Sequence, residues 1–280
     1  CSSGIGLEAA RMLAARGWRV FATCRKPEDC ARLSAEGLES FPLDLASENS
    51  VAAGAEEALR RCDGRLDGLF NNGAFAVPGA IEDVPRAAMR AIFETNLFGQ
   101  LDLTNRVLPA MRARGAGRIV MNSSVLGVVA APWRGAYVAT KFALEGLTDT
   151  LRLELAGSGV EICLIEPGPI ATAFRRNAIP HFEAHIDWRA SPRADAYQQT
   201  LMPRLYQPAA KKDRFVTLGT KPGVNWARVE KAREYIGLKG YVTNLSTATA
   251  SAAEIVAAYH DLFQVETTFR MAKTDLRARP

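Results

Sequence analysis

The stretch RIVMNSS at residues 118–124, followed by GAYVATKFALEGL at residues 135–147, decides the fold of this chain. The first part is a short apolar run that ends in polar residues, as a buried strand does. The second part has the apolar spacing of a helix that begins near Ala136, after a loop with glycine and proline. A strand, a loop and a helix in this order indicate an α/β protein with a parallel sheet.

Tyr137 and Lys141 are four residues apart, so their side chains lie on one face of the predicted helix. A tyrosine hydroxyl is too weak an acid to donate a proton at neutral pH unless a cation stabilises the phenolate, which Lys141 is placed to do. Ser124 ends the strand and would donate a hydrogen bond to a carbonyl oxygen that becomes an alkoxide. Together they predict carbonyl/alcohol interconversion, although a Tyr–Lys pair at this spacing also arises by chance on helix surfaces.

With these residues, the chain resembles the short-chain dehydrogenase/reductase family over residues 1 to about 213. The resemblance implies that Ser124, Tyr137 and Lys141 are catalytic. It also implies that Asn96, within ETNLFG at residues 94–99, completes a proton relay. The implied fold is a doubly wound, Rossmann-like parallel sheet.

The opening residues CSSGIG precede a helical pattern, which is typical of a turn that holds a pyrophosphate at a helix N-terminus. The family turn is Gly-x-x-x-Gly-x-Gly, and Gly4 and Gly6 match its second and third glycines. By this resemblance Ser3, Gly4, Ile5 and Gly6 bind the cofactor. The first glycine and the preceding strand have no counterpart here, so we expect a fragment of a longer polypeptide.

A second strand is predicted at Trp18 to Thr23, and it is followed by Arg25 and Lys26. An acidic residue at this point binds the ribose 2′-hydroxyl of NAD(H), whereas a basic residue accommodates the 2′-phosphate of NADP(H). Two bases and no acid predict NADP(H) as the cofactor. The alternative is a solvated loop at the start of a helix.

Further strands are predicted at Leu38 to Asp44, Leu66 to Phe70 and Val160 to Glu166, with a helix at Ser50 to Cys62. Where family members usually have Asn-Asn-Ala-Gly, residues 71–74 read Asn-Asn-Gly-Ala. The resemblance assigns the adenine to Asp44 and Leu45, at the end of the first of these strands. It assigns further cofactor contacts to the turns after the other two strands: Asn72, Gly73, Pro167, Gly168, Ile170 and Thr172. Tyr137 and Lys141 also contact the cofactor by this resemblance.

Two further segments bear on the site. Residues 81–112 are mainly helical by pattern and place Asn96 on an apolar-rich face, where a purely structural, hydrogen-bonded asparagine is the alternative. Residues 173–213 are rich in aromatic residues, and the resemblance implies a segment that covers an apolar alcohol or carbonyl substrate, although helix packing explains them equally well. His181 and His185 have metal-ligand spacing but no third ligand, so no metal site is predicted.

Composition narrows the class of protein. The chain has 280 residues, of which 48% are hydrophobic, and no apolar run of membrane-spanning length. Its five cysteines are odd in number and scattered, which favours reduced thiols. We therefore expect a cytoplasmic protein without a membrane partner, and a homo-oligomer stays open.

The sequence changes character near Arg214, and residues 214–280 form a basic tail. Its last predicted helix carries Tyr259, Glu266 and Lys273, which is similar to the end of DDE-type insertion-sequence transposases, although Leu262 stands where that family has Arg. The resemblance implies a domain boundary at 213/214 and a transposase fragment without metal-binding carboxylates upstream, and hence without phosphoryl-transfer chemistry.

The tail leaves alternatives open. It predicts at most a weak DNA contact, and the chain is alternatively a DNA-processing protein or a non-functional fusion product. A helix predicted at residues 225–236 and a strand at 240–245 would extend the sheet beside Val160 to Glu166 by a right-handed crossover.

Overall fold

The computed structural model describes residues 1–170, 172–206, 216–217 and 223–224, and the chain divides into two units, Cys1–Ala210 and Lys211–Pro280. In the second unit, β4 (Val216–Thr217) pairs antiparallel with β5 (Gly223–Val224). The elements predicted within 225–280, including the transposase-like helix and the added strand, lie outside the described residues. The boundary at 213/214 stays a prediction.

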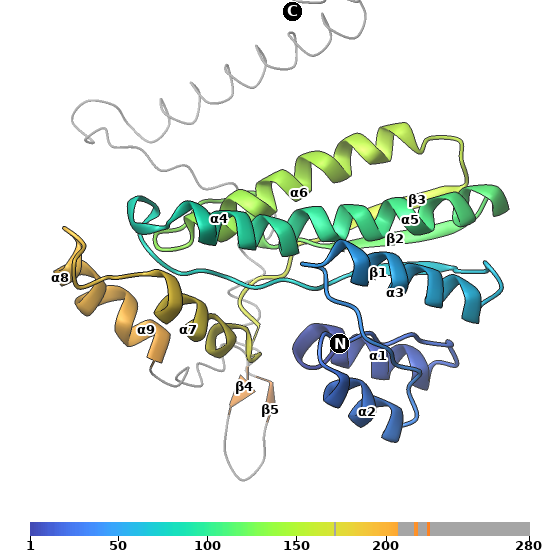
Figure 1. The fold of residues 1–280 in the computed structure, drawn as a ribbon, viewed down its shortest axis with the longest axis horizontal. Helices are drawn as coiled ribbons and strands as arrows, with labels where there is room; N and C mark the ends of the chain where they lie inside the picture. The colour runs from blue at the N-terminus through green and yellow to red at the C-terminus, as the bar shows by residue number, and fades with distance from the viewer. Residues whose placement is uncertain (171, 207–215, 218–222, 225–280) are drawn as a thin grey trace, which may run out of the picture. The chain divides into compact units, whose positions relative to one another are not determined.

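The first unit is built on a parallel sheet, as predicted (Figure 1). Its order is β1 (Gly68–Asn71), β2 (Gly117–Asn122) and β3 (Val160–Ile165), so β2 is the middle strand. Ile119 and Met121 of β2 are buried, because helices cover the face on which they lie. The apolar runs noted in the sequence therefore mark these strands correctly, within two residues at their ends.

The prediction of full strands at 18–23 and 38–44 is wrong. These segments are extended and parallel, but they meet only through isolated bridges, Phe21 with Glu39 and Cys24 with Pro42. Ala22 N donates to Glu39 O at 2.8 Å and Leu43 N to Cys24 O at 2.8 Å. Isolated bridges do not make a regular ladder, so the apolar runs here do not become full strands.

Helices cover and connect the strands (Figure 1). The longer ones are α1 (Gly4–Ala15), α2 (Pro27–Ala35), α3 (Glu48–Arg61), α4 (Arg86–Phe93), α5 (Gly99–Arg114), α6 (Gly135–Glu154) and α7 (Phe174–His185). The shorter ones are η1 (Ile81–Asp83), η2 (Glu94–Phe98), η3 (Val125–Gly127), α8 (Ala194–Ala196), η4 (Tyr197–Leu201) and α9 (Met202–Tyr206). No helix of the described residues is long and apolar enough to cross a membrane.

Helix α6 belongs to two buried clusters at once. Leu144 packs with Met111, Ile119 and Val160 in the core between the sheet and its covering helices. One and a half to two turns earlier, Tyr137 packs with apolar residues of α7, η4 and the loop after β1 in a second cluster. Burial on both sides fixes α6 in place, so the side chains it carries are held rigidly.

Candidate active site

The predicted pair on α6 is brought together in the structure. Tyr137 and Lys141 are buried, and the Lys141 Nζ lies 5.6 Å from the centroid of the Tyr137 ring. The Nζ also donates a hydrogen bond of 2.6 Å to the backbone oxygen of Asn122, at the end of β2. Asn122 had no place among the predicted site residues, because a backbone acceptor carries no signal in the sequence.

Burial shifts the pKa values of both groups. It lowers the pKa of Lys141 to about 8, and the charge of Glu145 acts in the opposite direction. It raises the pKa of the Tyr137 phenol, while the neighbouring Ser124 hydroxyl lowers it. The phenol therefore carries its proton at neutral pH. Lys141 is the cation able to stabilise the phenolate, and the Ser124 hydroxyl follows the end of β2. This arrangement suits proton donation to an oxygen atom.

Asn96 is fully buried in the π-helical turn η2, a geometry often found at functional sites. Its Oδ1 accepts from Phe75 N at 3.0 Å, and its Nδ2 donates to Phe75 O at 2.9 Å and to Thr140 Oγ1 at 3.2 Å. Asn96 thus ties the loop after β1 to α6 between Tyr137 and Lys141. Its proposed part in a proton relay stays a prediction.

The residues predicted for the cofactor converge from three segments. Gly4, which begins α1, has φ +61°, and a Cβ added to it would lie 3.5 Å from the Cβ of Thr172. A Cβ on Gly6 would lie 2.5 Å from Asn72 Nδ2 at the end of β1. Ser3 precedes α1 without capping it through its side chain, so the first N–H groups of the helix are open to an anion.

Leu45, one of the two residues predicted for the adenine, lies next to the end of β1. A Cβ on Gly73 would lie 2.6 Å from Leu45 Cδ1, and Asn72 Oδ1 accepts from Asn122 Nδ2 at 2.7 Å. Asp44 accepts through Oδ1 from Ala46 N at 3.0 Å. The side chain of Leu45 therefore packs against the turn that contains Asn72 and Gly73.

The remaining predicted cofactor residues lie at the edge of this region. Arg25 and Lys26 are exposed, and Lys26 immediately precedes α2. Pro167 accepts through its backbone oxygen from Val125 N at 3.2 Å, while Ile5 is half-buried and both Gly168 and Ile170 are exposed. Their contacts with a cofactor stay predictions.

Aromatic residues pack near Tyr137 and near the loop after β1. Phe174 of α7 packs edge-on against the Tyr137 ring at 5.4 Å between centroids, and His181 stacks on Phe75 at 4.1 Å. Among the described residues, no group of three or more His, Cys, Asp or Glu side chains is arranged to hold a metal. The aromatic face beside Tyr137 suits an apolar ligand.

Tyr197 of η4 is hydrogen-bonded to the segment around η1, far away in the sequence. Its buried hydroxyl accepts from Ala80 N at 2.7 Å and donates to Asp83 Oδ2 at 2.8 Å. Ser191 donates to the same carboxylate oxygen at 2.8 Å. The sequence marked Tyr197 only as one aromatic among several, because its partners lie more than a hundred residues away.

The Tyr197→Phe variant should lose about 1–3 kcal/mol of unfolding free energy, because the Ala80 N–H would lose its acceptor and the Asp83 carboxylate would keep only the hydrogen bond from Ser191. Equilibrium urea denaturation measures this loss. Tyr206 is the matched control: it donates to Glu183 at 2.8 Å on the surface, and Tyr206→Phe should change the free energy by no more than about 0.5 kcal/mol. Equal losses in the two variants would show that the hydrogen bonds of Tyr197 do not stabilise the fold more than a surface hydrogen bond does.

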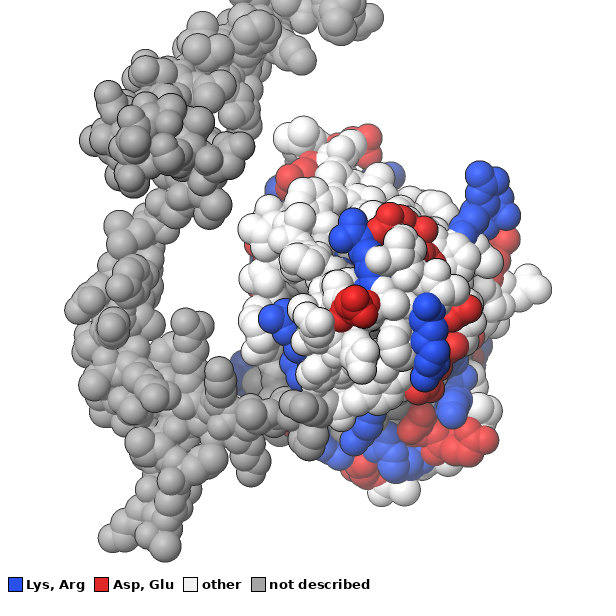
Figure 2. Space-filling view, turned by 90° about the vertical axis from the view of Figure 1, so that its left-hand side faces the viewer, with Lys and Arg blue, Asp and Glu red and all other residues white. Residues whose placement is uncertain are grey.

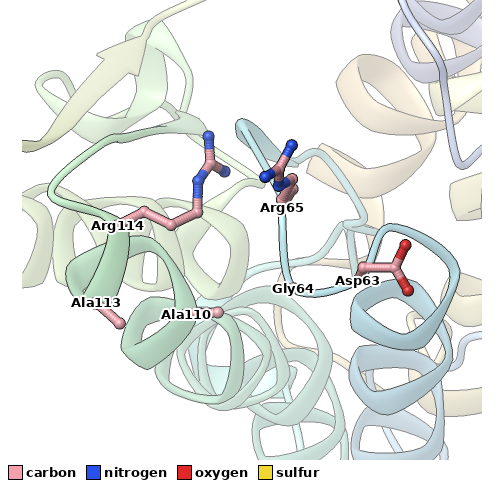
Figure 3. Close-up of a pocket in the computed structure, with 6 residues that line it drawn as sticks. All are labelled: Asp63, Gly64, Arg65, Ala110, Ala113 and Arg114. Carbon is pink, nitrogen blue, oxygen red and sulfur yellow. The ribbon is translucent and has the colours of Figure 1, made fainter.

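A surface depression of about 550 Å³ lies elsewhere, between the loop after α3 and the end of α5 (Figure 3). Its lining residues are Asp63, Gly64, Arg65, Ala110, Ala113 and Arg114. None of them belongs to the predicted site, and Arg114 pairs with Asp67 at 2.6 Å. This depression is therefore separate from the chemistry around Tyr137.

A parallel α/β sheet, a glycine turn at a helix start and a buried Tyr–Lys pair define a Rossmann-like protein with an oxidoreductase site. The chain matches the short chain dehydrogenase family over residues 1–181, and it belongs to that family. The predicted family is thus confirmed for this part of the chain. No finding supports the transposase resemblance of the tail.

Three similar proteins illustrate the relationship. The uncharacterized oxidoreductase YbbO of Escherichia coli is 49% identical over 177 residues, which cover 63% of this chain and 66% of YbbO, so the chain spans just under two thirds of that relative. Human retinol dehydrogenase 8 is 36% identical over 232 residues, or 79% of this chain and 72% of the relative. A metagenomic short-chain oxidoreductase solved with NADP is 32% identical with a TM-score of 0.56, over 60% of this chain and 79% of its own.

Proposed function

We propose that this chain is an NADP(H)-dependent oxidoreductase that interconverts an apolar carbonyl compound and the corresponding alcohol. The observation that carries the proposal is the arrangement on α6, where the buried Lys141 ammonium lies 5.6 Å from the Tyr137 ring and Ser124 lies beside the phenol. Family membership supports the reaction class, and the residue roles are our own assignment.

Each residue would have one role in the reduction direction. Tyr137 donates its proton to the carbonyl oxygen, and Ser124 donates a hydrogen bond to the same oxygen as it gains charge. The cation of Lys141, held by Asn122 O, stabilises the resulting phenolate. The nicotinamide cofactor supplies or accepts the hydride when it is bound. Asn96 keeps α6 and the loop after β1 in register through Thr140 and Phe75.

The local structure fits such a cofactor. Gly4 and Gly6 stand where side chains would strain the backbone or strike Asn72, so a pyrophosphate can approach the open N-terminus of α1 closely. Thr172 lies against Gly4, so the turn after β3 meets the start of α1. Arg25 and Lys26 are the groups that would bind a 2′-phosphate, and the related structure with NADP supports the choice of NADP(H).

Arg25→Ala should weaken NADPH binding by about 10-fold or more and leave NADH binding nearly unchanged, since NADPH alone carries the 2′-phosphate. Titration of nicotinamide fluorescence with each cofactor measures both constants. Arg16→Ala is the matched control, because Arg16 is an exposed arginine at the other end of α1. Equal losses for both cofactors in Arg25→Ala would show that Arg25 acts through folding.

The proposed substrate is apolar because Phe174 packs edge-on against the Tyr137 ring and Phe75 packs against the apolar cluster that contains Tyr137. The related human protein is named for retinol, an apolar alcohol, which supports the same class. Turnover of a panel of aldehydes and ketones of increasing polarity tests this choice. A preference for charged substrates over apolar ones of the same size would contradict it.

Nothing observed on the described residues favours the alternative of DNA binding. On the face shown in Figure 2, acidic and basic side chains are interspersed, so that face has no continuous basic surface. Residues 225–280 of the basic tail lie outside the described residues.

A further inference from the structure

A second ionisable residue lies on the active-site face of α6. Glu145 follows Lys141 by one helical turn, so the two side chains share a face. The Glu145 Oε1 atom is buried and has no hydrogen-bond partner among the described residues, and the same is true of the Ser123 Oγ. Buried carboxylates are costly and normally paired, so this one calls for an explanation.

Gly127 shows how closely these groups meet. A Cβ on Gly127 would lie 2.6 Å from Ser123 Oγ and 2.7 Å from Glu145 Oε1. Only glycine leaves room for the hydroxyl and the carboxylate at this point. Ser123 stands between Asn122, whose carbonyl holds Lys141, and Ser124 of the proposed site. The Glu145 carboxylate thus lies beside the segment that holds Lys141 and carries Ser124.

We infer that Glu145 is a positioning residue whose carboxylate, one helical turn from Lys141 and with one oxygen buried against Gly127, keeps the Lys141 ammonium charged and packs beside Ser123 at the end of β2. The importance of this role for catalysis rests on the proposed function, but the effect on the charge of Lys141 does not.

The surrounding charges set the direction of the effect. Tyr137 and Glu145 are the ionisable groups beside Lys141 on α6. Burial raises the pKa of Glu145, as do the charges of Glu166, after β3, and Asp149, on the next turn, whereas the charge of Lys141 lowers it. Burial lowers the pKa of Lys141 to about 8, and Glu145 opposes this shift. Removal of the Glu145 charge should therefore make Lys141 lose its proton at a lower pH.

The test is a titration of Lys141 by NMR in the full chain without cofactor. Lysine is labelled with ¹³C, and the Lys141 signal is assigned by its loss in Lys141→Arg. The wild-type pKa is expected to be about 8. In Glu145→Gln it should fall by about one unit, because the variant removes the opposite charge that counteracts burial. Asp149→Asn, one turn further along and exposed, should leave it nearly unchanged.

A second measurement needs no variant. In the wild-type chain, the ¹³C carboxyl signal of Glu145 should show a second inflection at the pH where Lys141 loses its charge, because the two groups are coupled. This keeps the inference testable if Glu145→Gln does not fold. A Glu145 signal without that inflection would overturn the inference, as would an unchanged Lys141 pKa in Glu145→Gln or an equal fall in Asp149→Asn.

The activity profile separates the inference from the proposed function. If the chain reduces carbonyl compounds, the alkaline limb of its pH profile should move about one unit lower in Glu145→Gln. Loss of activity in every form, with the shift of the Lys141 pKa still present, would reject the proposed function and leave the role of Glu145 standing.

Discussion

Tyr137→Phe is expected to lower turnover by about 10²–10⁴-fold and to leave NADPH binding within a few-fold of the wild-type value. The ring stays packed against Phe174, so the variant loses the phenolic proton and little else. Steady-state kinetics with an apolar aldehyde and a fluorescence titration with NADPH measure the two quantities separately. The expected result is a loss in kcat rather than in cofactor affinity.

The control for this variant is Tyr206→Phe. Tyr206 also loses a hydroxyl that is hydrogen-bonded to a carboxylate, that of Glu183, but it lies on the surface of α9. Its turnover should stay within a factor of two or so of the wild type. Substantial residual activity in Tyr137→Phe would refute the assignment of Tyr137 as the proton donor.

Lys141→Met should impair both turnover and cofactor binding, by about 10²-fold or more in kcat and about 10-fold in NADPH affinity. The variant removes the cation beside the phenol and the donor that Asn122 O accepts, while methionine fills most of the volume. The same kinetic and fluorescence measurements apply. A variant that binds NADPH normally and loses only turnover would show that Lys141 does not contact the cofactor.

The stability of Lys141→Met should depend on pH in a defined direction. Burial lowers the folded-state pKa of Lys141 from 10.5 to about 8, so the unfolded chain binds more protons between these values. The wild type therefore gains stability as the pH rises from about 8 to 10.5, and the variant lacks this gain. Urea denaturation at pH 7 and pH 10.5 should show that the free energy of unfolding of the wild type increases relative to that of Lys141→Met. A constant difference between them would mean that Lys141 titrates normally in the folded protein.

The sequence predicted the parts of the site that depend on local spacing. The four-residue interval between Tyr137 and Lys141 places both on one helix face in any α-helix, and α6 begins one residue from the predicted start. The apolar runs of β2 and β3 are equally local signals, because a short apolar run that ends in polar residues is typical of a strand in a parallel sheet.

The parts that were missed or wrong depend on contacts between distant segments. The extended segments around Phe21 and Glu39 have the composition of strands, but they meet only through isolated bridges. The partners of Asn96 and Tyr197 lie far away in the sequence, so neither periodicity nor a motif points to them. Glu145 had a local signal in its four-residue interval from Lys141, but only burial shows its significance.

The most direct test of the proposed function follows the hydride. The full chain is incubated with an apolar aldehyde such as retinal and NADPH carrying deuterium at the transferred position of nicotinamide C4, and the alcohol is analysed by mass spectrometry. We predict one deuterium on the carbon that bears the new hydroxyl, in a product that Tyr137→Phe hardly forms. Saturable NADPH binding without any deuterated alcohol from a panel of apolar aldehydes and ketones would contradict the proposal.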